Sequence, residues 1–473
     1  MIRVVRCTVS VICLLLAFAI PAAADEIKVG VAVADITPPI GYRMSGYFSE
    51  RLSTGTHDPL NAKAICFKQG DERAVLVFCD LSGMSPDVTS QARAMASEKT
   101  GIPAANIVIA ATHSHTGPLY FGALRKHFHD LALAKNGEDA QEEVDYPAEL
   151  TDKLVDVIMR AANVAAPARL ETGVTKETRL SFNRRFHLKN GTVQFNPGKL
   201  NPNIVRPAGP IDPDVGIVLV HGGEEKKPIA ALSVFALHLD TVGGTEYGAD
   251  YPYYLELALQ KSFGNDFVSL FGTGTCGDIN HIDVSHDRPQ KGNEEAERIG
   301  ARLAETIGAT LPKLKPEQLP ALAVRSARVN VPLQKYSEEE VEQARKDMHK
   351  IGTRELPFLK QVEAFKIMAI QLLDGPELPM EVQVFRLCEE VAIVGLPGEI
   401  FVELGLAIKL ASPFKTTLVI ELCNDAPGYV PTKKAFAEGS YEAVNSRVQS
   451  GGGEMLVETA VKLLKELKVN GNR

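Results

Sequence analysis

The sequence lacks three features that would assign it to a class at once: an excess of basic residues, a disulfide framework, and a long apolar run beyond its N-terminus. The 473 residues carry a formal net charge of −8, which argues against nucleic acid as a partner. No stretch after residue 24 is long and apolar enough to span a membrane. Internal repeats and low-complexity linkers are also missing, and the composition is ordinary for a globular protein.

Cysteine is scarce and scattered. Cys7 and Cys13 lie within the first two dozen residues, and the five that follow form an odd set within apolar sequence. Cysteines in such positions usually behave as small buried hydrophobic residues, and at most one or two pairs could form disulfide bonds. The five are Cys66, Cys79, Cys276, Cys388 and Cys423.

Residues 1–24 differ in composition from the rest of the chain. Arg3 and Arg6 form a basic start, residues 9–20 are apolar, and residues 22–24 offer an Ala-x-Ala cleavage site. This pattern predicts a signal peptide, with an uncleaved anchor as the alternative, and therefore export to the periplasm or the cell exterior. The expected organisation is a signal peptide at 1–24, followed at 25–473 by either two lobes or one large layered domain.

Apolar strand-like runs alternate with amphipathic helical stretches along the chain, which predicts a layered α/β fold. Two further regions are relevant to function. Residues 119–145 are polar and predict an irregular loop over the candidate site that the next paragraphs describe. A helix is expected at 399–410. The main predicted strands are 106–110, 229–238, 391–399 and 416–421, and the main predicted helices are 85–100, 147–164, 252–263 and 292–311.

His113 and His115 follow the predicted strand 106–110 and precede Gly117-Pro118, where the chain must turn. Ligands in open α/β sheets bind outside the carboxyl ends of the strands. Strand residues two apart point to the same side, so the two imidazoles can face one pocket, one as a metal ligand and the other beside it.

Other polar residues follow predicted strands in the same way. His238 ends one strand, Glu399 ends another, and Tyr429 lies in the loop after a third. Taken singly, each has a structural explanation: a core histidine, a charge at a helix N-terminus, and a half-buried turn aromatic. Arg184 alone would be a solvated loop charge.

Several segments together resemble the neutral and alkaline, non-lysosomal ceramidase family. The resemblance covers essentially the whole chain after residue 24, and it implies two central β-sheets flanked by helices. It also implies an amidohydrolase that cleaves an N-acyl amide, either ceramide or another lipid-like N-acyl amine, with zinc-activated water. The segments are Gly-x-Ala-x-x-Asp-Ile-Thr-Pro-Pro at 30–39, Ala-Thr-His-Ser-His-Thr-Gly-Pro at 111–118, Asn-Arg at 183–184, Phe-Ala-Leu-His at 235–238, Gly-Leu-Pro-Gly-Glu at 395–399 and Gly-Tyr-Val-Pro-Thr at 428–432.

The resemblance also assigns roles to individual residues. One zinc ion per chain is implied, and imidazole, carboxylate and phenolate donors suit that metal. His115 would transfer protons, and Arg184 and Tyr441 would stabilise the oxyanion. Residues that match the zinc ligands are His113, His238, Glu399 and Tyr429.

The chain departs from the family pattern in two places. The family has Gly-Asp-Val-Ser-Pro-Asn where residues 277–282 read Gly-Asp-Ile-Asn-His-Ile, so Asn280 replaces the serine. The family's C-terminal immunoglobulin-like domain is not expected here. Both departures leave other N-acyl amides, or esters, open as substrates. Asp80, Asp278 and Asn280 are expected to lie around the metal ligands.

Two other functions remain as alternatives. Cys276 could be a nucleophile with His281 or His238 as its base. The chain could also be a secreted, noncatalytic binding protein that keeps the fold.

Overall fold

The computed structural model describes residues 26–223, 227–317 and 320–469, and the predicted signal peptide at 1–24 lies outside them. Its larger sheet combines antiparallel hairpins with two parallel pairs, β4 with β5 and β12 with β14. In spatial order its strands are β14 (Val268–Thr273), β12 (Lys227–Phe235), β11 (Asp214–Gly222), β6 (Ala166–Lys176), β1 (Lys28–Asp35), β3 (Asn61–Gln69), β4 (Glu72–Cys79) and β5 (Ile107–Ala111), with β16 (Lys315–Pro316) paired to β6.

A second, smaller sheet packs face to face on the first. Phe78 and Val108 of the larger sheet share one core with Phe385 and Ile420 of the smaller one. Strands buried on both faces need apolar residues throughout, which explains the continuous apolar runs in the sequence. The strands, in order, are β17 (Pro320–Pro332), β18 (Glu377–Cys388), β19 (Val391–Gly395) and β21 (Thr416–Ile420).

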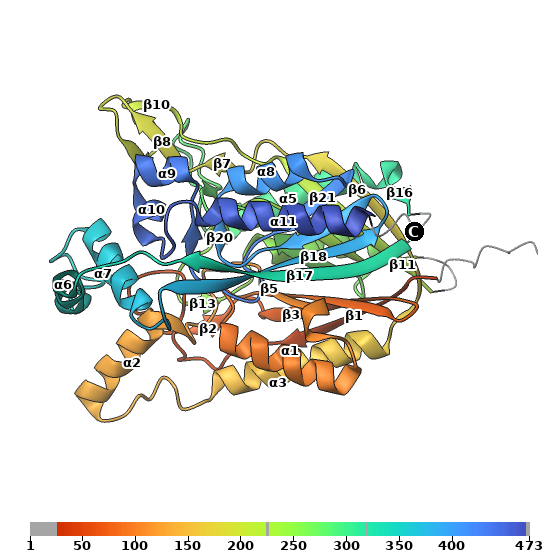
Figure 1. The fold of residues 1–473 in the computed structure, drawn as a ribbon, viewed down its shortest axis with the longest axis horizontal. Coiled ribbons are helices and arrows are strands. Elements are labelled where there is room, and N and C mark those ends of the chain that lie inside the picture. Colours follow the sequence, from red (N-terminus) through yellow and green to blue (C-terminus); the bar gives the residue numbers. More distant parts are fainter. Residues whose placement is uncertain (1–25, 224–226, 318–319, 470–473) are drawn as a thin grey trace, which may run out of the picture.

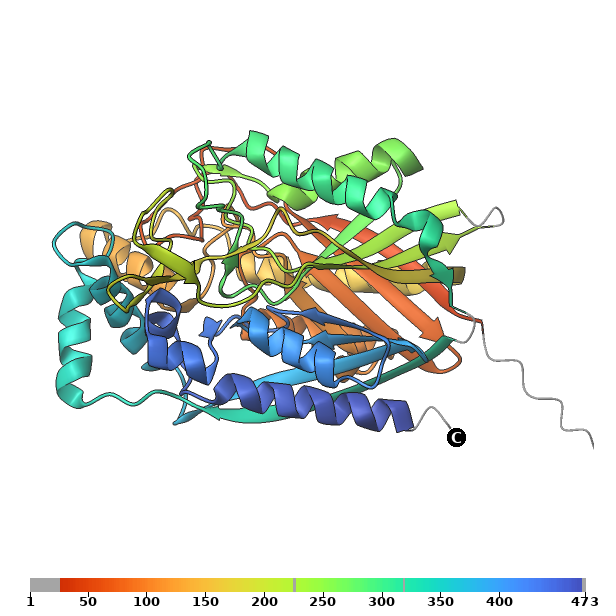
Figure 2. The same cartoon turned by 90° about the horizontal axis from the view of Figure 1, so that it is seen from above.

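Helices cover the outer faces of both sheets (Figure 1), and Figure 2 shows the layers from above. Amphipathic spacing determines the buried face: α3 buries Leu150, Leu154 and Ile158, and its N-cap Asp145 accepts a hydrogen bond from the Ala148 amide. The expected sandwich of two central sheets between helices is confirmed. The covering helices are α1 (Pro86–Thr100) and α3 (Tyr146–Asn163), α4 (Tyr251–Phe263) and α5 (Asn293–Gly308), and α8 (Val402–Ala411) and α11 (Gly452–Val469).

The remaining elements lie outside the layers. In the described part of the chain five helices do so, with α2, α6 and α7 together at one end (Figure 1). These helices are α2 (Gly122–Asn136), α6 (Glu338–Met348), α7 (Phe358–Ile370), α9 (Lys433–Glu438) and α10 (Tyr441–Asn445), with 3-10 turns at Ala104–Asn106 and Leu311–Lys313. The short strands are β2 (Gly55–Thr56) with β13 (Glu246–Tyr247), β7 (Phe182–Asn183) with β15 (Ile279–Asn280), β20 (Glu399–Ile400) with β22 (Tyr429–Val430), and β10 (Ile204–Pro207), β8 (Arg185–Leu188) and β9 (Val193–Phe195).

Two local predictions were wrong. Residues 119–145 were expected to form an irregular loop, but they contain α2, because Leu124 and Phe128 pack on Met348 of the distant α6. The helix expected at 399–410 begins at Val402, because Glu399 instead pairs in a short strand with Tyr429.

The five cysteines among the described residues are buried and free, as expected of small hydrophobic residues. Among the helices in the described part of the chain, none has the length and apolar character to cross a membrane.

Candidate metal centre and active site

The His113 segment leaves the sheet before its first histidine. β5 ends at Ala111, and His113 has a φ of 81°, a left-handed conformation that is uncommon outside glycine. Its backbone N–H donates to the Leu81 carbonyl at 2.8 Å. The strand alternation that was expected to align His113 and His115 therefore does not reach them, and this turn brings the two imidazoles together instead.

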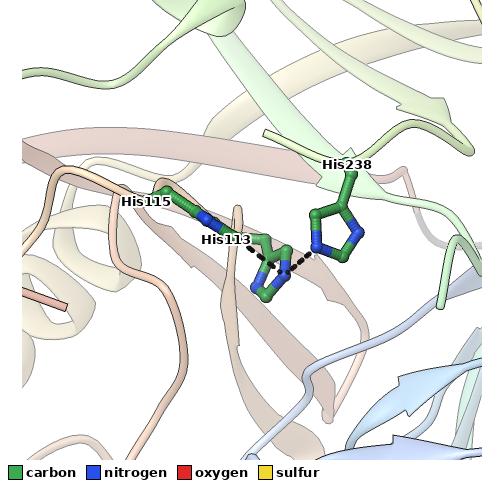
Figure 3. Close-up of side chains that lie close together, drawn as sticks. All are labelled: His113, His115 and His238. Atoms are coloured by element: carbon green, nitrogen blue, oxygen red, sulfur yellow. Dashed lines mark hydrogen bonds between the residues drawn. The ribbon is translucent and has the colours of Figure 1, made fainter. Parts of the chain in front are cut away.

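Three histidines converge on one point (Figure 3). His113 Nε2 lies 2.8 Å from His238 Nε2 and 3.4 Å from His115 Nε2. His238 comes from the loop after β12, so two distant segments supply the cluster. Nitrogen atoms of all three lie within 4.8 Å of one another, close enough to hold one metal ion.

Hydrogen bonds fix which nitrogen of each imidazole faces the cluster. His113 Nδ1 donates to the Ser82 carbonyl at 2.6 Å, and His238 Nδ1 lies 3.4 Å from the Cys276 carbonyl. Donation from Nδ1 leaves the Nε2 lone pair directed inward, the usual arrangement of a metal-binding histidine. Two such lone pairs 2.8 Å apart repel unless a proton or a cation lies between them.

Glu399 completes the inner set. Its Oε2 lies 3.4 Å from His113 Nε2 and 3.8 Å from His238 Nε2, and this buried oxygen has no hydrogen-bond partner among the residues that the structure describes. Burial alone would raise the pKa of Glu399, but His113, together with Arg184 and Tyr429, lowers it. For His113 the directions are reversed. Burial alone would lower the pKa of His113, but Glu399 raises it. A buried anionic oxygen beside two inward lone pairs fits a divalent cation.

Tyr429 and Tyr441 form one side of the site. Their ring centroids are 5.4 Å apart, and the guanidinium of Arg184 lies 5.4 Å from the Tyr429 ring centroid. Burial raises the pKa of both hydroxyls, so both remain protonated at neutral pH in the apo protein. A hydrogen bond from Tyr429 also helps to keep Glu399 ionised.

Arg184 is buried beside His238, with Nη1 3.5 Å from His238 Nε2. Its Nε donates to Glu442 at 2.9 Å, and its Nη2 donates to the Gly277 carbonyl at 2.8 Å. Burial opposes its charge, but the acidic groups around it, Glu442 and Asp240 among them, raise its pKa. The site therefore contains a fixed positive charge that is suited to a developing oxyanion.

His115 is held by the loop at 45–51. Its carbonyl accepts from Arg51 Nη2 at 2.7 Å, and the ring of Tyr47 meets its imidazole edge-on. Burial, reinforced by His113, lowers the pKa of His115 to about 3. His115 is therefore neutral at pH 7, and its buried Nδ1 has no hydrogen-bond partner in the described structure.

The three residues expected around the ligands are all buried. Asp80 lies within hydrogen-bond distance of the Thr112 hydroxyl and accepts from the Asn61 N–H, and Asp278 accepts from Asn183 and the Val402 N–H. The Asn280 amide donates to Asn196 and accepts from the Ile282 N–H. Asp278 also fixes the Arg184 backbone through its carbonyl.

The structure argues against a thiol nucleophile. Cys276 is fully buried, its Sγ donates to Glu421 at 3.0 Å, and burial raises its pKa well above the usual value. Of the two proposed bases, His238 has its Nδ1 3.7 Å from the Cys276 Sγ, whereas His281 faces Asp240 at 3.2 Å.

A cavity of about 200 Å³ opens onto the cluster, and we call it the catalytic cavity. Predicted site residues and aromatic side chains line it together. A larger cavity of about 860 Å³ near Thr172 and Lys409 touches none of the predicted site residues. The lining of the catalytic cavity includes His113, His115, Glu399, Tyr429, Tyr441, Tyr47, Phe48, Phe121 and Phe365.

Sequence reasoning missed Glu442, the buried partner of Arg184. The two residues are 258 positions apart, and no spacing rule pairs them. The available signal was the position of Glu442 directly after Tyr441, a charged residue next to a predicted site residue. The Ser82 carbonyl that orients His113 is a backbone group and gives no sequence signal.

Comparison with known proteins identifies relatives of this chain. A family model described as "Neutral/alkaline non-lysosomal ceramidase, N-terminal" matches residues 27–279, just over half of the sequence. Neutral ceramidase A of Dictyostelium discoideum is 24% identical over 275 residues, 54% of this chain and 35% of that protein. Neutral ceramidase of Pseudomonas aeruginosa is 30% identical over 287 residues, which are 56% of this chain and 39% of that protein. The aligned stretches thus span little more than a third of these relatives.

Solved structures show the same fold. The crystal structure of neutral ceramidase from Pseudomonas aeruginosa superposes with a TM-score of 0.72 at 19% identity, over 95% of this chain and 75% of that one. A structure titled "Ceramidase complexed with C2" gives a TM-score of 0.70 at 18% identity, over 94% of this chain and 76% of that one. At these identities the likeness establishes the fold.

Proposed function

The chain belongs to the neutral/alkaline non-lysosomal ceramidase family, and from this premise we propose that it is a zinc-dependent amidohydrolase. Its substrate is an N-acyl amide, either ceramide, as the names of its relatives suggest, or another lipid-like N-acyl amine. One observation carries the proposal: two inward-facing histidine nitrogens meet a buried carboxylate oxygen that has no hydrogen-bond partner in the described part of the chain.

The proposed metal ligands are His113, His238, Glu399 and Tyr429. Zinc in such a set supplies Lewis acidity and lowers the pKa of a water molecule to about 7. The carbonyls of Ser82 and Cys276 orient the two imidazoles from behind, which makes their Nε2 atoms better donors.

The other residues act on the substrate and its protons. His115, neutral at pH 7, accepts a proton from the attacking water at Nε2 and delivers it to the leaving amine nitrogen. Arg184 and Tyr441 donate hydrogen bonds to the oxygen of the tetrahedral species as its negative charge develops. The water oxygen joins the acyl carbon, the C–N bond breaks, and the products are a carboxylate and an amine.

We also propose that the catalytic domain comprises residues 25–473 and that the chain is exported, periplasmic or secreted. This rests on the signal-peptide pattern of residues 1–24.

Elemental analysis of the purified protein, paired with hydrolysis of a fluorogenic N-acyl sphingosine before and after chelation, tests the proposal. We expect about one zinc per chain and chelator-sensitive cleavage. Metal without cleavage of any amide or ester would favour a noncatalytic binding protein. A chain that binds no zinc would contradict the mechanism.

Two variants separate the proposed roles. His113→Ala is expected to lose both zinc and activity, whereas His115→Ala is expected to keep zinc and lose turnover by about 10²-fold or more. Full zinc occupancy in His113→Ala would show that the ligand assignment is wrong.

A further inference from the structure

Arg447 lines the catalytic cavity without a partner for its charge. Apart from the histidines, Glu399 and Arg447 are the lining residues that carry a formal charge at pH 7. The Arg447 guanidinium forms no hydrogen bond and no ion pair with any residue that the structure describes. Buried arginines elsewhere in the chain differ in this respect, because Arg43, Arg93 and Arg184 each form an ion pair with a carboxylate. Arg447 is therefore an uncompensated charge at the wall of the cavity.

The backbone around Arg447 is held in place by the segment that follows β17. The Gln334 N–H donates to the Arg447 carbonyl at 2.9 Å. The Gln334 side-chain amide donates to the carbonyls on either side, that of Ser446 at 2.7 Å and that of Val448 at 3.2 Å. The guanidinium carbon lies 6.0 Å from the ring centroid of Phe365, which also lines the cavity, within the range of a cation–π contact. The cation is thus positioned before a ligand arrives, which lowers the entropic cost of binding.

Two acidic residues act on Arg447 from a distance. Burial lowers the pKa of Arg447, and the charges of Asp425 and Glu399 oppose that decrease. Neither carboxylate forms an ion pair with Arg447 in the described structure, and Glu399 is also a proposed metal ligand. A cation that loses water without gaining a paired anion is destabilised. An anionic group in the cavity is therefore stabilised at this position.

Arg447 is also close to a residue proposed to act on the amide. α10 ends at Asn445, two residues before Arg447, and the Asn445 side-chain amide donates to the Tyr441 hydroxyl at 3.4 Å. All three residues line the catalytic cavity, which measures about 200 Å³. This volume is below the range of about 300 to 1,000 Å³ that is usual for cavities that enclose a small molecule, so it leaves little room for a second one. An anion at Arg447 is therefore part of the substrate itself.

We propose that Arg447 is a specificity-determining residue that binds a carboxylate group carried by the substrate. The planar guanidinium can donate two parallel hydrogen bonds to a carboxylate. This inference rests on the proposed function and narrows its substrate class to N-acyl amides that carry an acidic group, on either the amine portion or the acyl portion.

Two pairs of substrates test the proposal. N-octanoylglycine carries a carboxylate on its amine portion, and N-octanoylethanolamine is its neutral counterpart. N-octylsuccinamic acid carries a carboxylate on its acyl portion, and N-octylbutanamide is the neutral counterpart. We expect wild type to prefer the acidic member of one pair by about tenfold or more in kcat/KM, the effect of one charge-assisted contact, and Arg447→Met to lose that preference. The pair that shows the preference identifies the portion of the substrate that carries the acid.

Arg354 provides the matched control, because it is exposed and does not line the catalytic cavity. Arg354→Met is expected to keep the preference of wild type. Arg447→Lys keeps the charge but loses the parallel N–H groups, so it is expected to recover part of the preference. Circular dichroism confirms that the variants fold. Equal kcat/KM within both pairs for wild type, or a preference that survives in Arg447→Met, would overturn the inference.

Binding without turnover distinguishes this inference from the proposed function. Sulfonamide analogues of the four substrates replace the amide carbonyl by a sulfonyl group that resists hydrolysis, and calorimetry gives their Kd. We expect wild type to bind one acidic analogue about tenfold more tightly than its neutral counterpart and Arg447→Met to bind the two alike. The inference fails if wild type and Arg447→Met bind every analogue equally. Wild-type protein that binds an acidic analogue through Arg447 but hydrolyses none of the four amides would contradict the proposed function instead.

Discussion

Replacement of Glu442 by glutamine tests the electrostatic support of the site. The Glu442 side chain is 0% exposed and that of Arg184 is 3% exposed, and their ion pair spans 2.9 Å. Glu442 Oε2 also lies 3.9 Å from Nε of the buried Arg185, so one carboxylate faces two buried guanidinium groups. Glu442→Gln keeps the size and a hydrogen-bond acceptor but removes the negative charge.

Removing one partner of a buried ion pair costs about 3 to 5 kcal/mol, because the remaining charge stays buried without compensation. We expect Glu442→Gln to lose this much free energy of unfolding at pH 7. Turnover is expected to fall as well, since Arg184 is no longer held beside His238. The energetic cost arises from the isolated charge, so a variant that removes both charges, Arg184→Met with Glu442→Leu, is expected to recover part of the stability while remaining inactive.

Denaturant unfolding followed by circular dichroism measures the stability, and hydrolysis of the N-acyl substrate measures turnover. Glu458→Gln on the exposed face of α11 is the control, and a surface change of this kind is expected to shift stability by less than about 0.5 kcal/mol. A loss below about 1 kcal/mol in Glu442→Gln, with normal turnover, would refute the reasoning.

Three further predictions concern other buried polar groups near the site. Burial raises the pKa of Asp80 to about 7, so the folded protein retains a proton that the unfolded chain releases, and the stability present at about pH 4 is lost as the pH rises to 7. Asp80→Asn should therefore match wild type at pH 4 and exceed it by about 4 kcal/mol at pH 8 in denaturant unfolding; a constant difference would contradict this. Cys276→Ala should lose about 1 kcal/mol with its bond to Glu421, yet retain hydrolysis in the activity assay, and loss of activity would revive the thiol alternative. Asn280→Ser should not raise kcat and should lower stability by about 1 kcal/mol.

The layers of the fold could be predicted because their sequence signals are local. Runs such as residues 107–111 and 391–395 are apolar throughout because both faces of the strand are buried. α2 could not be predicted in the same way. Its apolar residues Leu124 and Phe128 find their partners on α6 and α7, more than 200 residues later in the chain, and without those partners the segment looks polar.

The candidate site could be predicted in part, and for mixed reasons. His238 and Glu399 follow strand ends as expected. His113 and His115 do share a pocket, but the left-handed turn at His113 achieves this rather than strand alternation. The roles given to Tyr429 and Arg184 came from the family resemblance, because neither residue lies in a pattern that indicates chemistry by itself.

The prediction for Asn280 follows from where its side chain is held. Its amide donates to Asn196 at 3.0 Å and accepts from the Ile282 N–H at 3.0 Å, and the residue is fully buried outside the lining of the catalytic cavity. The short strand that carries it pairs with Phe182–Asn183, directly before Arg184. Asn280 therefore supports the segment that positions Arg184, and a serine would break two partly buried hydrogen bonds without bringing a hydroxyl to the substrate. Crystallography of Asn280→Ser together with kcat measures both effects, and a gain in turnover would show that this position contacts substrate directly.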